Sequence, residues 1–153
     1  MPASEEDGSA PKSTWQSYIP AFLAIFGSFA LVFLRINVGG ERFISDGALM
    51  MLALASYLIA AVFHLTNLYA PFRFAEKLGL WAATLGVFFN LSSWLVRWVA
   101  AYDRELAIFN SQGANPADMP WVFRYVPFAN LYDLSLAFAF GAGITTLIVM
   151  RRK

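Results

Sequence analysis

Four polar and aromatic residues share one face of an apolar segment, and together they could contact an anionic, planar ligand. Trp94 lies four positions after Asn90, and Arg97 and Trp98 follow Trp94 by three and four positions. Residues at these spacings stack on one face of an α-helix. In this interpretation Arg97 pairs with a propionate or phosphate, because a guanidinium matches the geometry of such oxyanions. The alternative is structural: Asn90 forms an interhelical hydrogen bond, and Arg97 extends toward the membrane surface between the tryptophans.

His64, within the stretch AAVFHLTNLY, is the only histidine of the chain. An imidazole inside a membrane could ligate the iron of haem or the magnesium of chlorophyll, and an intramembrane ionisable group is a functional candidate by default. One histidine cannot supply both axial ligands of a bis-histidine haem site within this chain. The alternative is a structural or interfacial histidine, because His64 lies about two turns before Pro71, where its side chain can reach water. The sequence therefore permits haem or chlorophyll as a cofactor and requires neither.

The composition places these residues in a membrane protein. Of the 153 residues, 59% are hydrophobic and 14% are charged, whereas a soluble domain is roughly half apolar and about a quarter charged. The net charge of +1 and the lack of a basic tract argue against nucleic acid as a partner. The absence of cysteine excludes disulfides, thiol catalysis and cysteine-based metal or covalent haem sites. No cluster of histidine and carboxylate residues occurs in the apolar segments, so a metal site built by the protein alone is not expected.

Four apolar segments are long enough to cross a bilayer, whose hydrocarbon core of about 30 Å takes about 20 helical residues. Helices are required because lipid offers no hydrogen-bond partner to a free backbone N–H. The expected helices cover residues 15–37, 47–72, 75–102 and 131–150. The predicted fold class is therefore all-α, an integral membrane bundle of four transmembrane helices. Residues 1–14 have the composition of a flexible polar tail, and residues 151–153 form a basic C-terminal end.

A long connection, residues 103–129, separates the third and fourth expected helices. It contains several prolines and aromatic residues, among them Trp121 and Tyr125. Aromatic rings are favourable at membrane interfaces, so we expect an interfacial outer loop that provides a contact surface. With four spans, both termini lie on one side of the membrane. The basic residues 151–153 favour the cytoplasm for both termini and the opposite side for this loop.

The stretch RYVPFANLYDLSLAF, residues 124–138, leads into the fourth expected helix. Asn130 is a favourable N-cap, and Asp133, three residues later, can return a hydrogen bond to the backbone N–H of the cap. Asp133 is also favourable at the positive end of a helix dipole. Capping explains these two residues, but it does not explain why Pro127 and Tyr132 accompany them.

This arrangement resembles the amino-terminal half of the CcsA/ResC-type (system II) cytochrome c assembly proteins. The matching segments are residues 95–98, Leu-Val-Arg-Trp, and residues 127–133, Pro-Phe-Ala-Asn-Leu-Tyr-Asp. The resemblance covers roughly residues 50–150. Family members commonly have Pro-x-Ser-Asn-x-Tyr-Glu, so Ala129 and Asp133 depart mildly from the pattern. Asn90 occupies the position of a haem-handling histidine, and the tryptophan-rich haem-presenting segment and the later histidine-bearing helices have no counterpart in this chain.

The resemblance implies ancestry from, or partnership with, a haem-delivery machine in a bacterial-type energy-transducing inner membrane. Our first hypothesis is a non-catalytic integral-membrane subunit, surrounded by lipid and packed against the subunits of a larger respiratory or photosynthetic complex. The second is one half of a split haem transporter–ligase in cytochrome c maturation, with a c-type cytochrome or its assembly machinery as partner. A third is a pigment-binding protein in which His64 or Asn90 ligates chlorophyll.

Overall fold

The chain forms four long α-helices in the computed structural model, which describes residues 14–150. They are α1 (Ile19–Val38), α2 (Asp46–Tyr69), α3 (Arg73–Ser111) and α4 (Leu131–Met150), with short 3-10 turns before α1 and in the α1–α2 and α3–α4 connections. No β-strand occurs between residues 14 and 150. All four helices are long and apolar enough to cross a membrane. The predicted all-α fold with four membrane-length helices is confirmed.

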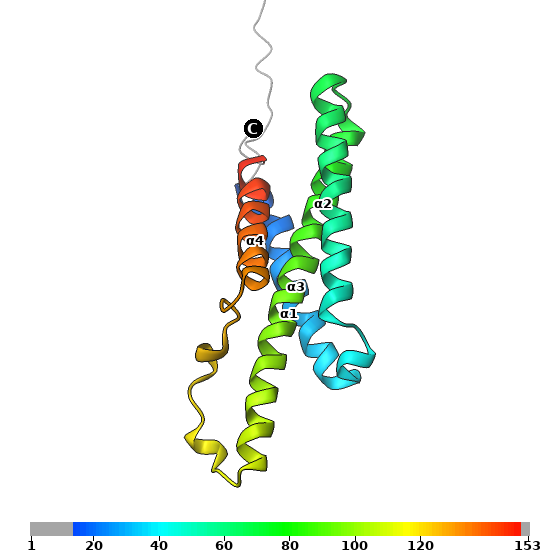
Figure 1. Ribbon diagram of the computed structural model, residues 1–153. Coiled ribbons are helices and arrows are strands. Elements are labelled where there is room, and N and C mark those ends of the chain that lie inside the picture. The colour runs from blue at the N-terminus through cyan, green and yellow to red at the C-terminus, as the bar shows by residue number, and fades with distance from the viewer. Residues whose placement is uncertain (1–13, 151–153) are drawn as a thin grey trace, which may run out of the picture.

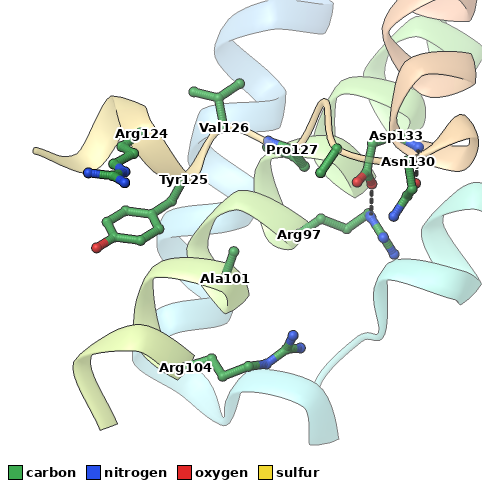
Figure 2. A pocket seen from close by; sticks show the side chains of 10 residues that line it. Arg97, Ala101, Arg104, Arg124, Tyr125, Val126, Pro127, Asn130 and Asp133 are labelled. Carbon is green, nitrogen blue, oxygen red and sulfur yellow. Dashed lines mark hydrogen bonds and ion pairs between the residues drawn. The ribbon is translucent and has the colours of Figure 1, made fainter. Parts of the chain in front are cut away.

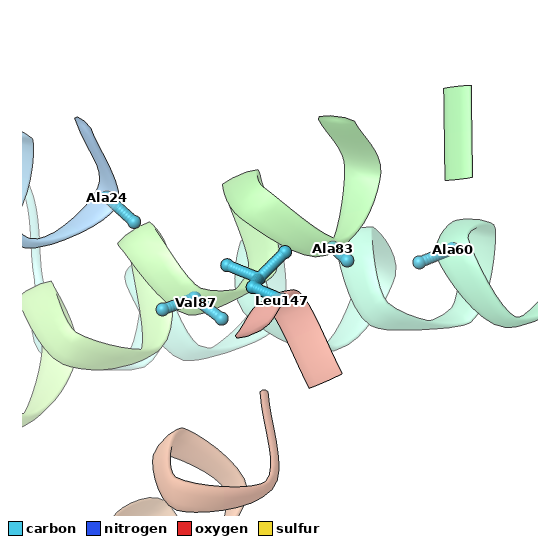
Figure 3. Packing of buried hydrophobic residues seen from close by; sticks show 5 residues of the cluster. All are labelled: Ala24, Ala60, Ala83, Val87 and Leu147. Atoms are coloured by element: carbon cyan, nitrogen blue, oxygen red, sulfur yellow. The ribbon is translucent and has the colours of Figure 1, made fainter. Parts of the chain in front are cut away.

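Helix α3 is the centre of the bundle, and each of the other helices packs against it (Figure 1). In its most apolar stretch 72% of residues are buried, against 22–28% in the other three. Its buried positions are mostly small or polar, which lets neighbouring helix backbones approach closely. One apolar cluster draws side chains from all four helices (Figure 3), namely Ala24, Ala60, Ala83, Val87 and Leu147. A second joins α1 and α2 to the later part of α3 and contains Val32, Leu49, Leu91, Leu95 and Val96.

The third helix is longer than expected, because it ends at Ser111 and not at residue 102. The charged residues 103–105 mark the end of the apolar stretch, but arginine and glutamate are good helix formers and do not stop the backbone. The chain turns at Gly113, whose φ of +67° is a conformation that glycine adopts without strain. The connection before α4 therefore covers residues 112–130 rather than 103–129.

The ends of the other helices differ from the prediction by a few residues. Residues 15–18 belong to a 3-10 turn, Thr14–Tyr18, which precedes α1. The oxygen of Ser45 accepts a hydrogen bond from Ala48 at the start of α2, so Ser45 is the cap. Helix α2 ends at Tyr69 instead of residue 72, whereas α4 has the predicted bounds. Residues 1–13 of the predicted flexible tail and the basic end 151–153 lie outside the described residues.

The connection to α4, residues 112–130, lies beside the last part of α3, and we call this connection the arm. A helix of 39 residues is about 58 Å long, about twice the thickness of a hydrocarbon core. The connection runs back beside this end of α3 to the start of α4 (Figure 1) and contains 3-10 turns at Pro116–Asp118 and Val122–Tyr125. Aromatic pairs hold it there: the ring centroids of Trp98 and Phe123 are 5.5 Å apart, and those of Tyr102 and Tyr125 are 5.8 Å apart.

Candidate functional site

Arg97 joins three helices through two ion pairs. Its Nε donates to Oδ1 of Asp133 on α4 at 2.6 Å, and one terminal nitrogen donates to Oδ2 of Asp46 on α2 at 2.9 Å. The ring of Tyr132 lies below the guanidinium, 4.4 Å from its carbon to the ring centroid. The side chain of Asp133 is 5% exposed and that of Arg97 28%. We call Asp46, Arg97 and Asp133 the ion cluster.

The local sequence brings both carboxylates to a helix start. Asp46 is the first residue of α2 and Asp133 lies in the first turn of α4, where the helix dipole favours negative charge. Asn130 accepts a hydrogen bond from the backbone N–H of Asp133 at 2.8 Å and so caps α4 as predicted. The predicted return bond from Asp133 to the cap is not among the hydrogen bonds of the described residues, because its carboxylate is turned to Arg97.

Asn90 is buried where α2, α3 and α4 meet, with 1% of its surface exposed. Its amide is satisfied when the oxygen faces the backbone N–H of Phe140 at 2.9 Å. In this orientation the oxygen also accepts from the hydroxyl of Tyr57 at 3.3 Å, and the nitrogen donates to the carbonyl of Leu136 at 3.2 Å. These contacts match the interhelical hydrogen bond of the structural interpretation.

Trp94 and Trp98 attach the arm to α3. The indole N–H of Trp94 donates to the carbonyl of Pro127 at 3.0 Å, and that of Trp98 donates to the carbonyl of Val122 at 2.9 Å. Asn90, Trp94, Arg97 and Trp98 thus follow one another along α3, but their polar atoms contact groups of this same chain. The ligand-binding role of these four residues stays a prediction.

His64 lies apart from the other candidates. Its ring packs on Gly79 of α3 so closely that a Cβ there would be 2.7 Å from Cε1 of the imidazole. Its Nε2 is buried and has no hydrogen-bond partner among the described residues. Gly79 and Arg97 are 18 residues apart on α3, about 27 Å along its axis. One ligand therefore cannot contact His64 and the Arg97 region together.

Three polar residues of the bundle, Arg35, Asp46 and Tyr57, were not predicted as site residues. Asp46 pairs with Arg97, and Tyr57 contacts Asn90. Arg35, 6% exposed, donates from Nε to the carbonyl of Ile44 at 2.8 Å and closes the turn between α1 and α2. One feature of the sequence could have indicated the Asp46–Arg97 pair. These two residues carry opposite charges and lie near the same end of the expected bundle.

A hollow of about 350 Å³ lies beside the ion cluster, between α3 and the arm (Figure 2). Among residues 14–150, no group of three or more histidine and carboxylate side chains is placed to hold a metal ion. No protein-family model, curated protein sequence or solved structure matches this chain. Fold and contacts define an all-helical protein with membrane-length helices, and the resemblance to the CcsA/ResC-type family stays a prediction from its sequence motif.

Proposed function

We propose that this chain is a non-catalytic integral-membrane subunit that packs against a larger respiratory or photosynthetic complex. The observation that supports the proposal is the set of intramolecular contacts made by the motif residues. Arg97 forms ion pairs with two carboxylates. Asn90 forms hydrogen bonds with groups of α2 and α4, and Asn130 caps the start of α4. The hydrogen bonds and ion pairs of these groups join the helices of the bundle, which supports a structural role for the motif.

The arm supplies a surface for the partner. Trp121 is 76% exposed, and Phe123 and Phe128 are each 55% exposed. Large aromatic side chains are the usual anchors of protein interfaces. The hydrogen bonds of Trp94 and Trp98 fix the arm before binding, which lowers the entropic cost of association.

The alternative function, one half of a split system II haem transporter–ligase, needs a ligand for haem iron. His64 is the only imidazole that the chain offers. Its unpartnered Nε2 favours this role, but the atom is buried against Gly79, so α2 and α3 would have to separate before iron could reach it. This geometry is why we place the subunit role first.

Purification from native membranes in mild detergent tests the proposal. We expect a recurring multi-subunit partner without bound haem. The variant Trp121→Ala/Phe123→Ala should lose that partner, because it removes the anchors of the arm. The control Phe33→Ala/Leu68→Ala changes two side chains on α1 and α2 that are 71% and 73% exposed, and it should retain the partner.

Three outcomes would contradict this assignment. Recovery of the chain without a recurring partner would refute the subunit role. Haem that co-purifies with the isolated chain and is lost in His64→Ala would favour the haem-handling alternative, which also requires that deletion of the chain abolish holo-cytochrome c. A pigment absorption band on the isolated chain would favour a pigment-binding protein.

The orientation in an inner membrane is tested separately with a single cysteine. Gln112 is exposed at the tip of the arm, and the chain has no cysteine of its own. In our orientation, with both termini in the cytoplasm, Gln112→Cys should react with a membrane-impermeant maleimide in intact cells. Cysteine at position 73, where Arg73 is exposed at the other end of the bundle, should react only after lysis. The opposite pattern would reverse the topology.

A further inference from the structure

The hollow between α3 and the arm is rich in arginine. Figure 2 shows Arg97 and Arg104 on α3, with the segment from Arg124 to Pro127 across from them. Arg97 and Arg104 are seven residues apart, which places them on one helix face about 10 Å apart along the axis. The lining residues are Arg97, Ala101, Arg104, Arg124, Tyr125, Val126, Pro127, Ala129, Asn130 and Asp133.

Two of these guanidinium groups are available to an anion. Within residues 14–150 both ion pairs belong to Arg97, and Arg104 and Arg124 form none. The only carboxylate of the lining, Asp133, is already engaged by Arg97. Guanidinium groups bind phosphate oxygens through paired, charge-assisted hydrogen bonds. The hollow therefore offers two unpaired cations on two different elements.

The position of the hollow favours a lipid headgroup phosphate over a free phosphate ion. It lies at the depth where α2 and α4 begin, since the first turns of both helices contact Arg97. Trp94, Trp98 and Tyr125 lie at the same level, and tryptophan and tyrosine concentrate at the depth of lipid headgroups. A lipid headgroup is part of the surroundings at this depth, whereas a free phosphate has to bind from solution.

We propose that the hollow binds the phosphate of an anionic phospholipid, with Arg104 and Arg124 supplying the positive charge that attracts the headgroup. The probe is phosphatidylglycerol, added to the delipidated full chain in mild detergent, and bound lipid is measured by native mass spectrometry. Phosphatidylglycerol should bind more tightly than phosphatidylcholine, whose choline cancels the phosphate charge. The variant Arg104→Gln/Arg124→Gln should weaken binding about thirtyfold, at about 1 kcal/mol for each arginine at the surface.

The control Arg42→Gln/Arg73→Gln removes the same charge from exposed positions outside the hollow and should bind phosphatidylglycerol like the unmodified chain. Without lipid, both double variants should unfold at the same temperature as the unmodified chain. This result would show that neither variant has lost its fold. Equal loss in the control, or unchanged binding in Arg104→Gln/Arg124→Gln, would overturn the proposal. So would inorganic phosphate that displaces the lipid at comparable concentration, because the hollow would then be a site for small anions.

Discussion

Replacing Arg97 by methionine is expected to lower the free energy of unfolding by about 3 kcal/mol, the low end of the range for breaking a buried ion pair. The change leaves Asp133, whose side chain is 5% exposed, as a charge without its partner. We expect a loss at the low end of this range because the side chain of Arg97 is 28% exposed and its charge is partly solvated. Asp46, 38% exposed, can regain water and adds little to the loss. Reversible unfolding in mixed micelles, as dodecyl sulfate is increased, measures the effect.

The matched control is Arg104→Met, measured without added lipid. Arg104 lies two turns further along the same helix face and has no ion pair among the described residues, so its loss should change stability by about 0.5 kcal/mol or less. The double variant Arg97→Met/Asp133→Leu removes both charges and should be more stable than Arg97→Met alone. Equal stability of Arg97→Met and Arg104→Met would show that the ion cluster does not hold the helices together.

Substituting Gly143 by alanine should cost about 2 kcal/mol, a typical value for overpacking a filled core. A Cβ there would lie 2.7 Å from both the Tyr57 hydroxyl and Cγ2 of Val87. The Tyr57 ring cannot retreat, because its other side packs on Gly86, where a Cβ would lie 2.6 Å from Cδ1. The new methyl group therefore pushes α4 away from α2 and α3 and stretches the hydrogen bonds of Asn90. Thermal unfolding in detergent measures the loss.

Gly141, two residues earlier on α4, provides the comparison. Beyond the adjoining turns of α4, no atom of the described residues lies within 4 Å of a Cβ built there, so Gly141→Ala should leave stability unchanged or raise it by up to about 1 kcal/mol through helix propensity. In Gly143→Ala/Tyr57→Leu the shorter side chain should recover part of the loss. If Gly143→Ala and Gly141→Ala unfold at the same temperature, the close packing around Tyr57 does not determine how α4 docks.

The parts of this fold that depend on composition and on neighbours in sequence were predictable. Apolar length identified four helices, and the types of residues 130 and 133 identified the start of α4. Helix ends were harder to predict where the apolar stretch and the helix do not end at the same residue. The charged residues 103–105 end the apolar stretch of α3, but the helix continues to Ser111. For a helix that is longer than its apolar stretch, hydropathy indicates where the apolar stretch ends and not where the last hydrogen-bonded turn lies.

Contacts between distant residues were not predictable in the same way. Asp46 and Arg97 are 51 residues apart, and no periodicity relates residues on different helices. The sequence also left open whether Asn90 faces a ligand or a neighbouring helix, because both roles need the same buried amide. The contacts of Asn90 with Tyr57 and with the α4 backbone depend on the packing of three helices, which the sequence pattern does not specify.

The order of the ion cluster along the chain has a consequence for biosynthesis. Asp46 precedes Arg97, and Asp133 follows it by 36 residues. A guanidinium entering apolar surroundings alone is costly, but when Arg97 leaves the ribosome its first counter-ion has already been synthesised. Helix α4 then arrives with the second carboxylate and docks onto a pair that is electrically neutral. At no stage of synthesis is Arg97 without a carboxylate on the chain that precedes it.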